Sequence, residues 1–168
     1  NDPTPTFDPN SPEPGVAYEC RIDFGPYQAC SDPYTPPGAL ADGLHTFEVR
    51  GIDGAGNIDP SPASHDFTVD TVAPTVTLTA PSGLTNDDTP MLNISIDDAS
   101  PIATADCRIV PVGPTGTAVT VPCEDGASLP HLDDGTYQIY ADPVIDAAGN
   151  ASTTAGPIFD VDATGPTL

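Results

Sequence analysis

Two loops of the sequence carry acidic and asparagine residues whose oxygen atoms could bind calcium. Calcium takes six to eight oxygen ligands, mostly from carboxylates and carbonyls. Each loop supplies most of one set of candidate ligands, and the last ligand of the set follows a later strand. We expect the loop and that last ligand to lie at the same end of a domain. A cation held there would stiffen the joint to the next domain. The candidate ligands are Asp53, Asn57, Asp59 and Asp70, then Asp146, Asn150 and Asp162, with Asp160 as a nearby extra.

The same two loops also have good turn chemistry. Glycine adopts positive φ without steric cost, and Asp and Asn side chains cap nearby backbone N–H groups. The spacing lacks the full pattern of an EF-hand. The sequence therefore leaves a calcium site and a purely structural turn both open, and calcium is the only cofactor that it suggests. The loops are Asp53-Gly54-Ala55-Gly56-Asn57 and Asp146-Ala147-Ala148-Gly149-Asn150.

The remaining polar residues fit no catalytic arrangement. Adjacent residues on a strand point to opposite faces, so two neighbouring aspartates do not form the facing carboxylates of a glycosidase. The histidines lack metal-binding spacing, and the chain has no nucleophile elbow or Gly-rich phosphate loop. We predict no catalytic residue and no enzyme activity. The acidic pairs are Asp97-Asp98 and Asp133-Asp134, and the histidines are His45, His65 and His131.

Two tripeptides match the acceptor pattern for N-linked glycosylation. They are Asn93-Ile94-Ser95 and Asn150-Ala151-Ser152. The pattern is short and frequent by chance, and its use depends on whether the source organism glycosylates.

Four cysteines fall in two clusters, Cys20 with Cys30 and Cys107 with Cys123. Four cysteines allow three pairings. Pairing within each cluster would close loops of about ten to sixteen residues and stabilise each by about 3 kcal/mol. Neither cluster has the C-x-x-C spacing of a redox or zinc site. Since disulfides persist in oxidising compartments, the cysteines predict a secreted or cell-surface protein.

The charge balance is strongly negative. The 168 residues include 25 Asp and Glu against three Arg and no Lys. Such a surface repels phosphate backbones, so nucleic acid is excluded as a partner. The absence of Lys also excludes lysine–asparagine cross-links within the segment. No run of 18 apolar residues is present, so we expect no membrane span.

Apolar residues alternate with polar ones in short segments that proline and glycine separate. Period-2 alternation is typical of half-buried strands, and strands spaced in this way indicate a β-sandwich. No useful length shows helical spacing. The inward-facing residues expected are Tyr18, Cys20 and Ile22; Phe47 and Val49; Phe67 and Val69; Val76 and Leu78; Leu92, Ile94 and Ile96; Tyr137 and Ile139; and Phe159 and Val161.

The sequence contains two copies of one pattern. Residues 40–74 match residues 132–166, and residues 1–5 match residues 86–90. The strand expected before Asn86 has no counterpart before Asn1. We therefore expect an Ig-like repeat lacking its first strand at residues 1–73, a second repeat at 74–162 and the start of another linker or strand at 163–168. The chain is either a window on a longer array or a filament subunit whose terminal strand completes the next copy.

The combined pattern resembles bacterial Ig-like tandem repeats of large secreted surface proteins. The resemblance is clearest in the first repeat, and the second is more divergent. It implies an all-β fold of tandem immunoglobulin-like β-sandwiches. The segments that carry it are Tyr18-Glu19-Cys20-Arg21-Ile22-Asp23, Tyr27-Gln28-Ala29-Cys30, Leu40-Ala41-Asp42-Gly43-Leu44-His45-Thr46-Phe47-Glu48-Val49-Arg50, Asp53-Gly54-Ala55-Gly56-Asn57 and Phe67-Thr68-Val69-Asp70-Thr71-Val72-Ala73-Pro74.

The resemblance implies an extension role as a spacer, stalk or adhesin shaft, sometimes with calcium at the joints. The expected partners are neighbouring repeats or copies of the same protein. The alternatives are a self-assembling extracellular filament joined by strand exchange, or a binding module at the tip of an array. A binding module needs an exposed aromatic cluster, for which Tyr27 and Tyr34 are the only starting points.

Overall fold

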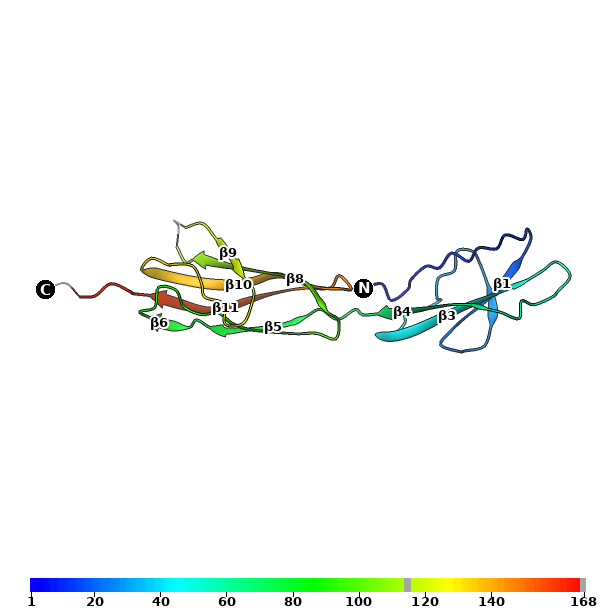
Figure 1. Cartoon of the computed structure of the whole chain (residues 1–168), viewed down its shortest axis with the longest axis horizontal. Helices are drawn as coiled ribbons and strands as arrows, with labels where there is room; N and C mark the ends of the chain where they lie inside the picture. Colours follow the sequence, from blue (N-terminus) through cyan, green and yellow to red (C-terminus); the bar gives the residue numbers. More distant parts are fainter. Residues whose placement is uncertain (114–115, 167–168) are drawn as a thin grey trace. The chain divides into compact units, whose positions relative to one another are not determined.

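Every regular element in the part of the chain that the structure describes is a β-strand (Figure 1). The structure is a computed structural model that describes residues 1–113 and 116–166. Among these residues no helix is long and apolar enough to cross a membrane. The predicted all-β fold is confirmed. The chain divides into two compact units, Asn1–Thr71 and Val72–Leu168.

The first unit is one antiparallel sheet with strand order β2-β1-β3-β4. Its N-terminal segment, dark blue in Figure 1, runs along the unit and belongs to no strand, but Phe7 forms an isolated bridge with Tyr34. Of the residues predicted to face inward, three are buried, Cys20, Phe47 and Val69, and four are half-buried, Tyr18, Ile22, Val49 and Phe67. The bounds are β1 (Ala17–Ile22), β2 (Gln28–Cys30), β3 (Gly43–Ile52) and β4 (Ala63–Val69).

The second unit contains two sheets. The larger has strand order β6-β11-β10-β8-β9, and the smaller pairs β5 with β7. All pairs are antiparallel except β6 with β11, which is parallel. The bounds are β5 (Thr75–Ala80), β6 (Gly83–Thr85), β7 (Asn93–Asp97), β8 (Ile102–Pro111), β9 (Val119–Pro122), β10 (Gly135–Asp146) and β11 (Ala151–Val161).

The core of the second unit lies between its two sheets. Leu78 of β5 and Ile94 of β7 pack with Ile139 of β10 and Phe159 of β11 in one buried cluster. The sheets approach closely because β11 carries Gly156, where an added Cβ would lie 3.1 Å from Cβ of Leu78. This unit is therefore a β-sandwich.

Matching hydrogen bonds show that both units follow one design. The Leu40 N–H donates to the carbonyl of Pro3 at 2.8 Å, and the Leu132 N–H donates to the carbonyl of Asp88 at the same distance. The aligned first residues of β3 and β10, Gly43 and Gly135, each pair with a valine that ends the neighbouring strand. The sequence repeat is therefore also a structural repeat.

The units differ at their beginnings and ends. β5 and β6 have no counterpart in the first unit. Residues 163–166, within the predicted start of another linker or strand, carry no strand, and residues 167 and 168 lie outside the described part. The segment around Asp8 and Asn10, which aligns with β7, also forms no strand.

Candidate functional site

The two aspartate-containing loops form the same turn. The Asp53 N–H donates to the carbonyl of Asn57 at 3.0 Å, and the Asp146 N–H donates to that of Asn150 at 3.1 Å. Each aspartate carboxylate then accepts both the backbone N–H and the side-chain Nδ2–H of its asparagine, at 2.7–2.8 Å. The carboxylates therefore close the turns, as the turn interpretation predicts.

Both turn aspartates are held in the charged form. Hydrogen bonds from Asn57, first from its side chain and then from its backbone, lower the pKa of Asp53. At Asp146 burial raises the pKa, but hydrogen bonds from Asn150, Gly149 and Ala148 outweigh that effect, so the pKa lies below its ordinary value. A carboxylate offers about four lone-pair positions. Charged oxygens with remaining lone pairs suit a hard cation such as calcium.

In the second unit a further carboxylate stands beside the turn. Carboxylate oxygens of Asp98 and Asp146 lie within 4.8 Å of each other. Asp98 directly follows β7, is half-buried and accepts the Ser100 N–H at 2.8 Å. The sequence interpretation missed Asp98 because it grouped this residue with Asp97 as a solvated pair. The signal available was its place just after a strand.

In the first unit three of the predicted ligands line one shallow hollow. The hollow has a volume of about 240 Å³ and brings together Asp53, Asn57 and Asp59, with Glu13 added from the N-terminal segment. The Asp59 carboxylate accepts the Ser61 N–H and hydroxyl, each at 2.8 Å, which lowers its pKa. Glu13, Asn57 and Asp59 are exposed, and Asp53 is half-buried.

The last predicted ligand of each set lies at the opposite end of its own unit from the loop that holds the other ligands. Asp53 follows the end of β3, whereas Asp70 follows Val69, which pairs with Gly43 at the start of β3. By the same register, Asp162 and Asp160 lie at the opposite end of the second unit from Asp146 and Asn150. The expectation that the members of one set share one end of a domain is therefore wrong.

Two of the histidines, His45 and His131, lie beside aspartate carboxylates of their own unit. His45 Nδ1 lies 2.7 Å from Oδ2 of Asp23, and its Nε2 lies 2.8 Å from the carbonyl oxygen of Ala41. The Ala41 carbonyl and then the Asp23 carboxylate raise the pKa of His45, while the hydrogen bond from His45 lowers the pKa of Asp23. His131 Nδ1 lies 3.0 Å from Oδ2 of Asp88, with its side chain largely exposed.

An arginine–tyrosine stack in the first unit was not predicted. The guanidinium groups of Arg21 and Arg50 both lie over the Tyr27 ring, with their Cζ atoms 4.3 and 4.0 Å from its centroid. Arg50 also pairs with Glu19 at 2.6 Å and Arg21 with Glu48 at 2.7 Å. The face of Tyr27 is thus covered by protein and does not form an open aromatic platform for a ligand.

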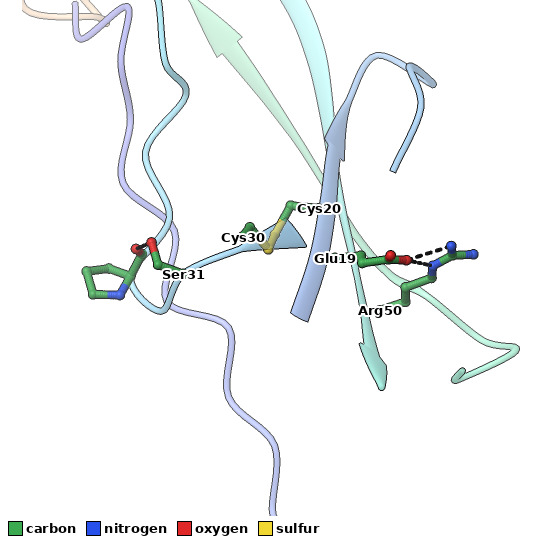
Figure 2. Close-up of a disulfide and its surroundings, with 6 residues drawn as sticks. Glu19, Cys20, Cys30, Ser31 and Arg50 are labelled. Carbon is green, nitrogen blue, oxygen red and sulfur yellow. Dashed lines mark hydrogen bonds and ion pairs between the residues drawn. A yellow bond between two sulfur atoms is a disulfide. The ribbon is translucent and has the colours of Figure 1, made fainter. Parts of the chain in front are cut away.

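Each unit carries one disulfide. Cys20 of β1 is joined to Cys30 of β2, and Cys107 of β8 to Cys123 after β9. Figure 2 shows the Cys20–Cys30 disulfide on one side of β1 and the Glu19–Arg50 pair on the other, as strand alternation requires.

The two glycosylation candidates have different surroundings. Asn93 is exposed on β7, and its Oδ1 accepts the Thr79 hydroxyl at 2.9 Å. Asn150 is buried, and its Nδ2 donates to Asp146. Of the two amide groups, that of Asn93 is therefore the accessible one in the folded chain.

No protein-family model and no curated protein matches the sequence. The chain is similar to a solved crystal structure described as a tetra-tandem repeat in the extending region of a large adhesion protein. The two share 24% sequence identity with a TM-score of 0.39, over 88% of this chain and 42% of that chain. This chain thus spans less than half the length of that one.

Proposed function

We propose that the chain is a structural extension module, serving as spacer, stalk or shaft in a larger extracellular surface protein, and that it is not an enzyme. The direct repetition of one design carries this proposal. The Leu40–Pro3 bond recurs as Leu132–Asp88, and the second unit begins at the residue after the first unit ends. Repeating a unit in this way adds length to a protein without adding a new site.

The disulfides support an extracellular location for this module. Both join cysteines within one unit, and the structure describes no free cysteine. Disulfides are rare where cellular thiols are kept reduced. The net charge of −22 keeps such a surface soluble and attracts cations.

Calcium is the proposed cofactor of this module. In the second unit Asp98 and Asp146 supply carboxylate oxygens within 4.8 Å of each other. In the first unit Glu13, Asp53 and Asp59 line one hollow. Oxygen donors of this kind suit calcium, which would add rigidity to the loops that carry them.

Small-angle X-ray scattering of the purified chain tests the extension role. For a single compact domain of this length the radius of gyration is about 15 Å. An extension module is expected to give a clearly larger value that does not change with protein concentration. A value near that of a compact globule would contradict the proposal.

A further inference from the structure

One aspartate in each unit bonds to the segment that follows the last strand of that unit. In the first unit Oδ1 of Asp42 accepts both the N–H and the hydroxyl of Thr71, each at 2.9 Å. In the second unit Asp134 accepts the Ala163 N–H on Oδ1 at 2.8 Å and the Thr164 hydroxyl on Oδ2 at 2.7 Å. The bonded residues are 29 or 30 positions apart, so these are not local turn contacts.

Both aspartates occupy the same place in the fold. Each directly precedes the glycine that begins the longer strand of the last hairpin, Gly43 of β3 or Gly135 of β10. Those glycines pair with Val69 and Val161, the last residues of β4 and β11. The aspartate therefore lies where the last strand of its unit ends, and its carboxylate reaches the second residue beyond that strand.

The contact is the same in the two units although the donor residues differ. Thr71 supplies both donors, whereas Ala163 at the corresponding position has no hydroxyl and the next residue, Thr164, supplies it. One carboxylate thus receives one backbone N–H and one threonine hydroxyl in either unit. The Thr164 hydroxyl, and after it the Ala163 N–H, lowers the pKa of Asp134, as expected for bonds donated to a charged carboxylate.

This contact shortens the stretch of chain that joins the two sets of strands. The β3–β4 ladder ends at Val69 and the β5–β7 ladder begins at Thr75, so the joint consists of residues 70–74. Holding Thr71 leaves three residues of the joint beyond the contact, the last of which is Pro74. The proline ring fixes its own φ and restricts the residue before it. Few backbone dihedral angles then remain that could redirect the chain.

We propose that Asp42 is a positioning residue that stiffens the joint after the first unit, and that Asp134 does the same for the segment after the second. This inference rests on the proposed extension role and names the residue that limits bending within it. An extension module adds length only if its joints do not fold back. Both aspartates are exposed, so either contact breaks without exposing the core of its unit.

The test compares the alignment of the two units by NMR. The whole chain is labelled with nitrogen-15 in a dilute alignment medium, and residual dipolar couplings give an alignment tensor for each unit separately. In the wild-type chain the two tensors should have equal magnitude. In Asp42→Ala they should differ, and the Thr71 amide should exchange with solvent at least about tenfold faster. Asp42→Asn retains Oδ1, which accepts both bonds, and should keep the tensors nearly equal.

Two further variants complete the test. Thr71→Val keeps the backbone donor and removes only the hydroxyl, so it should change the tensors in the same direction by a smaller amount. It also keeps the test decisive if Asp42→Ala disturbs β3 and β4. Asp133→Ala removes a carboxylate whose side chain is 96% exposed, and it should match the wild-type chain. Unchanged amide positions in β1–β4 show that the first unit of a variant is folded.

Three results would overturn the proposal. Unequal tensors in the wild-type chain would show that the contact does not stiffen the joint. Equal tensors in a folded Asp42→Ala chain would show that the contact only closes the β3–β4 ladder. Identical behaviour of Asp42→Asn and Asp42→Ala would assign the effect to charge and not to hydrogen bonding. The extension role is judged separately, because the radius of gyration of the wild-type chain decides it whatever the tensors show.

Discussion

Phe7 and Phe47 stack face to face in the first unit, with ring centroids 4.1 Å apart and ring planes 9° apart. Tyr34 stacks beside Phe47, with its centroid 5.6 Å away. An N-terminal segment with almost no strand hydrogen bonds is thereby attached to the sheet through its aromatic ring. The small core of this unit depends on that attachment.

Phe7→Ala is expected to destabilise the first unit by about 2–4 kcal/mol, because it removes a stacked ring and leaves a cavity. Denaturant unfolding should show the loss only in the transition of the first unit. Leu92→Ala, the matched change in the second unit, should lower the other transition. An unchanged first transition in Phe7→Ala would show that the segment contributes nothing to stability.

Tyr27 offers a paired test of the arginine stack. Its hydroxyl is buried and has no hydrogen-bond partner among the described residues. Tyr27→Phe is therefore expected to leave stability unchanged or slightly higher. Tyr27→Leu removes the ring face from both arginines and should cost about 1–2 kcal/mol. Thermal unfolding of both variants measures the difference, and equal stabilities would contradict a role for the stack.

The His45–Asp23 pair should make the stability of the first unit depend on pH. The pKa of His45 is raised on folding, so its contribution is full below its ordinary pKa of about 6.5 and is lost as pH rises through the higher folded value. The pKa of Asp23 is lowered, so its contribution is present above about pH 4 and is lost on further acidification.

Unfolding midpoints of the first unit should therefore be highest between about pH 4 and 6.5 and should decline on either side. In His45→Gln the decline on the alkaline side should disappear. His131→Gln, which changes a largely exposed histidine of the second unit, is the control and should leave the first transition unchanged. A wild-type alkaline slope retained in His45→Gln would assign that slope to another group.

Each disulfide is expected to stabilise only its own unit. The double change Cys20→Ser with Cys30→Ser should cost the first unit roughly 3 kcal/mol through the entropy of the unfolded chain. The corresponding change at Cys107 and Cys123 should affect the second transition by a similar amount. Calorimetry of the two variants checks this, and a shift of both transitions in either variant would show that the units unfold together.

Calcium should stabilise the chain if the proposed ligands act together. At a hundredfold excess over the dissociation constant, binding to the native state alone adds about 2.7 kcal/mol, and excess chelator should reverse it. Asp98→Asn should abolish the response of the second unit while leaving its calcium-free midpoint nearly unchanged. Asp160→Asn, at the far end of that unit, should retain the response. If calcium does not shift the unfolding midpoint of the wild-type chain, Asp53 and Asp146 act only in closing their turns.

Local patterns in the sequence predicted much of this fold. Alternation at Phe47 and Val49, and again at Phe159 and Val161, marks strands because neighbouring side chains on a strand face opposite ways. The repeated Asp-to-Asn loops indicate turns for an equally local reason. Alternation also predicted a strand at Leu92, which instead precedes β7.

The features that were missed depend on pairing between distant segments. The carboxylates of Asp98 and Asp146 lie close together because the ends of β7 and β10 are neighbours in the folded unit. The spacing of these residues along the chain does not indicate that proximity. Tyr27 stacks on Arg50 only because β1 lies between β2 and β3. The strand register that separates Asp70 from Asp53 is likewise a property of the sheet.

The parallel pairing of β6 with β11 has a mechanical consequence. A tension applied through the two chain ends of the second unit pulls β6 backwards and β11 forwards along the same ladder. The hydrogen bonds of that ladder then bear the load simultaneously in shear, whereas an antiparallel hairpin opens one bond at a time. Under a steadily increasing pull, the second unit should therefore hold to a higher force than a fold whose terminal strands form an antiparallel hairpin.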